Sequence, residues 1–71
     1  MKNIVALGKR IKQYRVLKGV SQEELSKLTG ITQKHISNIE IGLKSPTVST
    51  LERIVQALDI EMFDLFKEDN K

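Results

Sequence analysis

The chain has 71 residues, of which 39% are apolar and none is cysteine. We therefore expect one small domain, without a disulfide framework or a thiolate zinc site, as is usual in a reducing compartment. No apolar run approaches the roughly 18 residues of a membrane span, and the N-terminus lacks the apolar core of a signal peptide, which predicts a cytoplasmic protein with no membrane partner.

The first predicted element is an amphipathic helix over about residues 4–17. The sequence Lys18-Gly19 supplies a basic last turn followed by a glycine, which is typical of a helix C-terminus. Apolar residues recur at spacings of three and four, which is the helical pattern, at Ile4, Leu7, Ile11, Tyr14 and Leu17.

Two short helices should follow, joined by a tight turn. The sequence Ser21-Gln22-Glu23-Glu24 matches a capping box, which predicts a helix that begins at Gln22. Gly30 suits the positive φ of the turn, and Thr32 is in the position of the next N-cap. Two short helices with such a connection are typical of a helix-turn-helix motif. Their expected inward residues are Leu25, Leu28, Ile36 and Ile39.

Two further helices are predicted in the C-terminal part. The third helix should stop at Gly42, and Thr47 is a plausible cap for a fourth helix. A short fifth helix follows, and residues 66–71 are expected to form a flexible tail. The prediction is thus a single all-α domain over residues 1–71, a compact five-helix bundle. Apolar residues of the last two helices are Val48, Leu51, Ile54, Val55 and Leu58, then Ile60, Met62, Phe63, Leu65 and Phe66.

The net charge of +3 is unevenly distributed along the chain. Residues 1–45 carry nine Lys/Arg against three Glu, whereas residues 46–71 carry three Lys/Arg against six acids. This asymmetry favours a domain that presents one side to phosphates. Chance variation on a solvated surface is the alternative.

These motifs, in this order and spacing, resemble the phage-repressor and Cro-type (XRE-like) helix-turn-helix domains. The likeness covers about residues 6–66, through LGKRIKQYR, LKGVSQEEL, LTGIT, ISNIEIG, SPTVSTLERIVQALDI and FDLF. The resemblance implies a lambda-repressor-like bundle whose third helix enters the major groove of double-stranded DNA. It also implies a transcriptional regulator that generally works as a dimer.

One face of the third helix is polar. Gln and Asn amides pair with adenine and Lys pairs with guanine in the major groove, so we expect this face to contact bases, with Ser37 contacting either a base or a phosphate. An ordinary solvated helix face is the alternative. The residues, which lie opposite Ile36 and Ile39, are Gln33, Lys34, Ser37 and Asn38.

Phosphate contacts are expected at the edges of this face. The candidates are Gln22 at the start of the second helix and Lys44 with Ser45 in the loop after the third. Arg10 and Lys9 are weaker candidates. The resemblance further implies a structural ion pair between Arg15 and Glu40 that joins the first helix to the end of the third.

The chain departs from the family pattern at a few positions. Ile41 and Leu43 stand where polar or basic residues are common, so we expect some of the family's phosphate contacts to be absent. Phe63, beside Met62, replaces a usually polar residue and indicates a dimer interface, with burial of Phe63 in the core as the alternative. His35 is interpreted as a surface residue.

No catalytic constellation is visible, so we expect neither an enzyme nor a metal or cofactor site. Gly8-Lys9 lacks the first glycine and the Ser/Thr of a phosphate-binding loop. The favoured function is a homodimeric repressor that reads a palindromic operator in double-stranded DNA. The alternative is a protein-interaction module or an antitoxin, with a protein partner, on the same scaffold.

Overall fold

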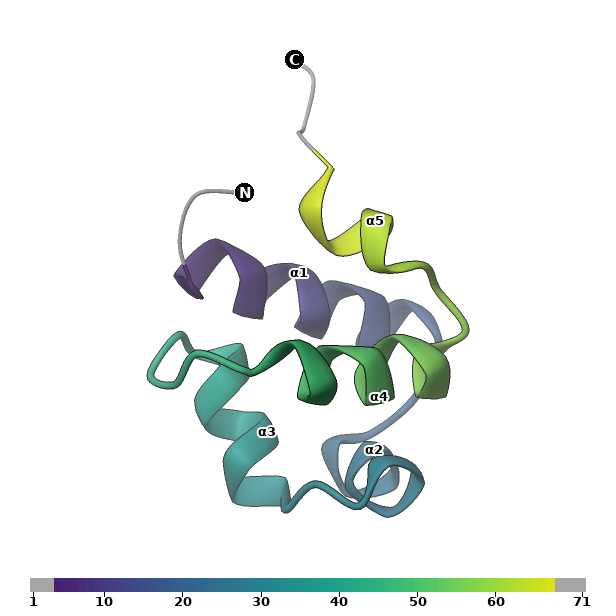
Figure 1. Cartoon of the computed structure of the whole chain (residues 1–71). Coiled ribbons are helices and arrows are strands. Elements are labelled where there is room, and N and C mark those ends of the chain that lie inside the picture. Colours follow the sequence, from purple (N-terminus) through teal and green to yellow (C-terminus); the bar gives the residue numbers. More distant parts are fainter. Residues whose placement is uncertain (1–3, 68–71) are drawn as a thin grey trace.

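The computed structural model describes residues 4–67, and within this range it contains five α-helices and no strand (Figure 1). The helices are α1 (Ile4–Leu17), α2 (Gln22–Thr29), α3 (Gln33–Glu40), α4 (Val48–Leu58) and α5 (Met62–Phe66). None of them is long and apolar enough to cross a membrane. The all-α bundle predicted from the sequence is therefore confirmed.

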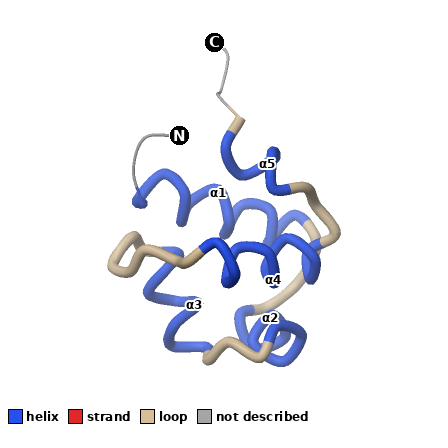
Figure 2. The backbone as a smooth tube through the Cα atoms, in the orientation of Figure 1, coloured by secondary structure: helices blue, strands red, loops and turns tan. Residues whose placement is uncertain are grey.

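The helices α1 and α4 lie in the middle of the bundle, with α2 and α3 on one side and α5 on the other (Figure 1). The helix α3 packs on α1 and α2, α2 also packs on α4, and α5 packs on both α1 and α4. Figure 2 shows that the connections are short and that the loop between α3 and α4 projects from the bundle. The helix-turn-helix pair thus occupies one side of the protein.

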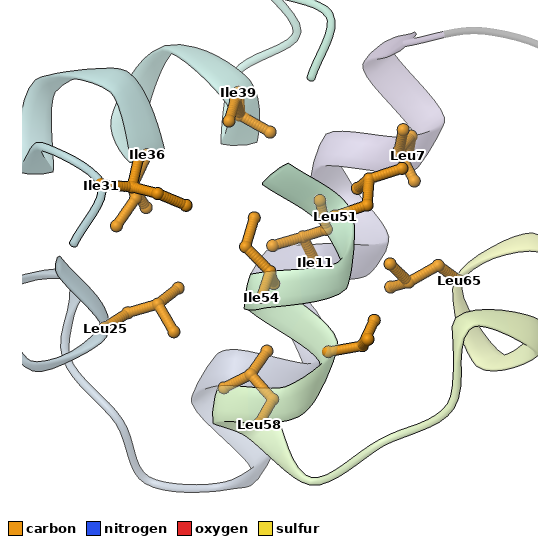
Figure 3. Close-up of a cluster of buried hydrophobic side chains, with 11 residues drawn as sticks. Leu7, Ile11, Leu25, Ile31, Ile36, Ile39, Leu51, Ile54, Leu58 and Leu65 are labelled. Atoms are coloured by element: carbon orange, nitrogen blue, oxygen red, sulfur yellow. The ribbon is translucent and has the colours of Figure 1, made fainter. Parts of the chain in front are cut away.

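The core receives side chains from every helix, and α4 contributes more of them than any other helix. Ile54 is fully buried and lies between the side chains of α1 and those of α2 (Figure 3). Burial of each such side chain contributes about 1.5–3 kcal/mol. The buried apolar residues are Leu7, Ile11, Leu25, Ile31, Ile36, Ile39, Leu51, Ile54, Val55, Leu58 and Leu65.

Leu28, which the sequence predicts to face inward, is instead exposed, and so are two residues of the helical apolar pattern. Leu28 is 62% exposed, and Leu17 and Val48 are also exposed. Each lies in the first or last turn of its helix. In the turn between α2 and α3, Ile31 is buried, although the sequence pattern does not single it out.

The helix starts agree with the local sequence signals. Ser21 Oγ accepts from the backbone N–H of Glu24 at 3.0 Å, and Glu24 Oε1 accepts from the backbone N–H of Ser21 at 2.9 Å, which completes the capping box. Thr32 and Thr47 each cap the following helix through their hydroxyl oxygen. Gly30 has φ +77°, as the turn requires. Each of these helix starts is therefore set by a capping residue close in sequence to the backbone group that it binds.

The helix α1 spans Ile4–Leu17, as predicted, whereas two boundaries nearer the C-terminus differ slightly from expectation. The helix α3 ends at Glu40 rather than Gly42, and Gly42 has φ +81°. Gly42 also permits a close contact, because a Cβ there would lie 2.7 Å from Cγ2 of Val5. Phe66 belongs to α5 and not to a tail. Residues 68–71 of the expected tail lie outside the described residues.

Candidate nucleic-acid interface

The helix α3 presents its polar face away from the core. Gln33 and Lys34 are exposed, and Ser37 and Asn38 are half-buried. Ile36, on the opposite side, is buried against the other helices. The four predicted base-contacting residues therefore share one accessible face. His35 lies at its border and is half-buried.

The backbones of α1 and α3 touch at Gly8. A Cβ at this position would lie 2.1 Å from the carbonyl oxygen of Ile39 and 2.8 Å from that of Glu40. Any side chain would therefore separate the two helices. The sequence motifs relate Gly8 only to a phosphate-binding loop, which it does not complete. The signal for its packing role is a glycine in the middle of an amphipathic helix, which often marks close packing.

Arg15 and Glu40 form the ion pair that the family resemblance implied. Arg15 Nε donates to Glu40 Oε2 at 2.6 Å and Nη2 donates to Oε1 at 3.1 Å. The two side chains are only 10% and 2% exposed, so the pair is a buried, bidentate one. Arg15 Nη1 also donates to the carbonyl oxygen of Val20 at 2.8 Å. The network joins α1, the connection to α2, and the end of α3.

Gln22 belongs to the same network. Its Nε2 donates to Glu40 Oε1 at 3.0 Å, a contact that the sequence does not indicate. Gln22 is the first residue of α2 and is half-buried. The end of α3 and the start of α2 are therefore linked by a side-chain hydrogen bond.

The loop after α3 is attached to α3 by backbone hydrogen bonds. The N–H groups of Leu43 and Lys44 both donate to the carbonyl oxygen of Asn38, at 2.8 and 3.2 Å. The side chains of Lys44 and Ser45 are exposed. These two predicted phosphate-contacting residues thus follow α3 directly and are accessible.

Arg10, a weaker candidate for a phosphate contact, is engaged at the end of α5. Its Nη1 donates to the carbonyl oxygens of Lys67 at 2.9 Å and Asp64 at 3.3 Å. A cation at the C-terminal end of a helix stabilises the unpaired carbonyl groups there. Because α5 lies on the opposite side of α1 from α3 (Figure 1), Arg10 is separated from the other candidates.

The two dimer-interface candidates differ in exposure. Phe63 is 70% exposed, so the alternative that it packs in the core is wrong. Met62 packs against the core and is half-buried. Phe66, in the same helix, is exposed as well.

Among the described residues, no group of three His, Cys, Asp or Glu side chains is arranged to hold a metal ion.

An α3 with an accessible polar face, fixed by its C-terminal end to α1 and α2, defines a helix-turn-helix protein. Comparison of the sequence with known families agrees with this class: the Helix-turn-helix (HTH_3) family model matches residues 11–65. The chain belongs to this family.

Relatives with this motif are described as transcriptional regulators. The chain is 36% identical over 66 residues to the HTH-type transcriptional regulator SinR of Bacillus licheniformis, a match that covers 92% of the chain and 60% of SinR. It is 34% identical over 67 residues to the HTH-type transcriptional regulator PuuR of Escherichia coli (strain K12), covering 94% of the chain and 36% of PuuR. The chain therefore spans only part of these relatives.

Solved structures share this fold over most of the chain. The restriction-modification controller protein C.AhdI from Aeromonas hydrophila superposes with a TM-score of 0.86 at 33% identity, covering 89% of this chain and 96% of that one. The clp gene regulator ClgR from C. glutamicum superposes with a TM-score of 0.83 at 28% identity, covering 86% and 78%. The chain is similar to small controllers and to domains of larger regulators alike.

Proposed function

We propose that the protein is a transcriptional regulator that binds specific sequences in double-stranded DNA by inserting α3 into the major groove. The observation that carries this proposal is the contrast within α3. Gln33 and Lys34 are exposed at its start, whereas Glu40 is buried in an ion pair at its end. A rigidly mounted helix with a free polar face suits a groove that is about 12 Å wide.

Base recognition is assigned to the polar face. Gln33 and Asn38 carry amides that suit the N6/N7 edge of adenine, and Lys34 suits O6/N7 of guanine. Ser37 would contact either a base or a phosphate. Each good pair contributes about 1–3 kcal/mol of discrimination against the wrong base.

Backbone binding is assigned to residues on both sides of this face. Gln22 lies at the start of α2, and Lys44 and Ser45 lie in the loop that is bonded to Asn38. Contacts from these residues would set the register of the protein on DNA without reading its sequence. Arg10 is not included, because it binds the end of α5.

We further propose a cytoplasmic homodimeric repressor on a palindromic operator. Two-fold symmetric dimers of helix-turn-helix domains read half-sites roughly 34 Å apart. The exposed Phe63 supports self-association through α5, with Met62 beside it. Replacement of Phe63 by Glu should leave the chain helical and abolish the dimer in analytical ultracentrifugation. A dimer that survives this replacement would exclude α5 as the interface.

Selection of bound fragments from random duplex DNA tests the proposed function. We expect a palindromic consensus, and we expect the logarithm of the binding constant to fall steeply with the logarithm of salt concentration, by about 0.9 for each phosphate neutralised. Recovery of no consensus, with a flat salt response, would contradict the proposal.

The competing function is a protein-interaction module or an antitoxin. Ile41 and Leu43, both 65% exposed, favour it, because they place apolar surface directly after α3. Co-purification of a stoichiometric partner, together with DNA binding that is unaffected by Gln33→Ala plus Asn38→Ala, would support this competing function.

A further inference from the structure

A surface notch lies between α1, the start of α2 and the end of α3. Its volume is about 450 Å³, and its walls include Lys9 and Lys12 of α1 and the side chain of Gln22. Glu40 also lines the notch. The notch therefore combines two exposed cations with a neutral amide that is bonded to a buried carboxylate.

The carboxylate determines which way the Gln22 amide is turned. Glu40 Oε1 accepts from Gln22 Nε2 at 3.0 Å, and an ionised carboxylate can only accept hydrogen bonds. Turning the amide by 180° would place its oxygen against Glu40, with two acceptors facing each other. The nitrogen side is therefore the side that faces Glu40.

This orientation leaves a donor for a second acceptor. The Gln22 amide nitrogen carries two hydrogens, and Glu40 engages one of them. A DNA phosphate oxygen also accepts hydrogen bonds and does not donate them. Lys9 and Lys12, in the wall of the same notch, add positive charge. The notch thus matches the chemistry of a backbone phosphate.

Glu40 cannot change position easily. Arg15 holds both of its oxygens, at 2.6 and 3.1 Å, and its side chain is 2% exposed. Glu40 is also the last residue of α3. A single buried carboxylate therefore connects the base-reading helix with the side chain that faces the notch.

We propose that Glu40 is a positioning residue for DNA binding: through Gln22 it presents an N–H donor to a phosphate of duplex DNA in the notch. This inference rests on the proposed function. Its consequence is that the backbone contact and the reading helix move as one unit, so the phosphate contact fixes the placement of α3 in the groove.

A double-mutant cycle measured on random duplex DNA tests the inference. The first change is Arg15→Met plus Glu40→Leu, because replacing a buried ion pair by apolar residues is often neutral for stability and here leaves the net charge unchanged. The second is Gln22→Met. We expect each change to weaken binding by about threefold to tenfold, the effect of one hydrogen bond. Combined, they should weaken binding no more than either alone.

Gln13→Met is the matched control, because Gln13 lines the same notch without a hydrogen bond to Glu40. When Gln13→Met is combined with the ion-pair replacement, the loss of affinity should equal the product of the two separate losses. Thermal unfolding of each variant shows that the measured protein is folded. If Gln22→Met weakens binding while the ion-pair replacement does not, or if their losses multiply, Glu40 does not act through Gln22.

A measurement on the unmodified protein covers the case in which the ion-pair replacement does not fold. The two side-chain amide hydrogens of Gln22 give separate nuclear magnetic resonance signals. We expect random duplex DNA to shift one signal strongly and the other weakly. If the protein binds DNA and neither signal shifts, the inference about Glu40 and Gln22 is wrong while the proposed function stands. If the protein binds no DNA, the proposed function itself is wrong.

Discussion

The two ends of α3 are supported very differently. At the C-terminal end, Gly8 lets the backbone of α1 touch α3, and Glu40 is bound by Arg15 and Gln22. At the N-terminal end, Gln33 and Lys34 are exposed. The difference separates two tasks. The buried end fixes α3 to α1 and α2, and the exposed end carries the residues for which we propose contacts with DNA.

The largest effect is expected from breaking the buried end. Arg15→Met leaves the Glu40 carboxylate buried without its cation, which should cost about 3–5 kcal/mol of the free energy of unfolding. For a domain of this size that is a large part of the total. Urea denaturation followed by circular dichroism measures the change. The control, Arg15→Met plus Glu40→Leu, should recover most of the loss. A single variant as stable as the original protein would show that the pair is not buried in solution.

The second largest effect is expected where the backbones of α1 and α3 are in contact. Gly8→Ala places a methyl group within 2.1 Å of the Ile39 carbonyl oxygen, and overpacking of this kind costs about 1–3 kcal/mol. Because α3 must then move relative to α1, affinity for the selected operator should fall even where the variant is folded.

Gly30→Ala is the comparison for Gly8→Ala. Gly30 has φ +77°, and a Cβ added there would meet no other atom within 4 Å, so the change introduces about 1–2 kcal/mol of backbone strain without a collision. The folded Gly30→Ala variant should keep its operator affinity. Equal losses of affinity in both variants would indicate that stability alone, and not the direction of α3, limits binding.

Changes at the exposed face should affect recognition without affecting the fold. Asn38→Ala should cost about 1–3 kcal/mol of binding free energy on the selected operator and change affinity for random duplex very little. Fluorescence anisotropy with the two duplexes measures both. Gln56→Ala, an exposed amide on α4, should change neither. Equal losses on operator and random duplex would remove Asn38 from the base-reading set.

The smallest effect is expected in the loop after α3. Lys44→Ala should weaken operator and random duplex binding to a similar degree and lower the salt slope by about one. Lys27→Ala removes the same charge from a side chain that is 77% exposed and 3.8 Å from Glu23, and it should leave the slope unchanged. A slope that Lys44→Ala does not alter would exclude a phosphate contact at this residue.

Much of the fold was predictable because its signals are local. The caps at Ser21, Thr32 and Thr47 act on backbone groups within three residues, so the sequence determines where α2, α3 and α4 begin. Helical spacing alone could not show that Leu28 is exposed, because exposure depends on where the neighbouring helices end.

The contacts between helices were less predictable, because they join residues that are far apart in the chain. Gly8 meets the end of α3, Gln22 meets Glu40, and Arg10 meets the end of α5. Nothing in the neighbouring sequence indicates these contacts. The ion pair between Arg15 and Glu40 was expected only through resemblance to a family.

The most direct test of the central claim is a titration of the ¹⁵N-labelled protein with the selected duplex, followed by the backbone amide signals. If α3 enters the groove, signals of Gln33, Lys34, Asn38 and Lys44 should shift strongly while those of Met62–Phe66 in α5 remain nearly unchanged. Shifts concentrated in α5, with α3 unaffected, would contradict the claim that α3 is the DNA-reading helix.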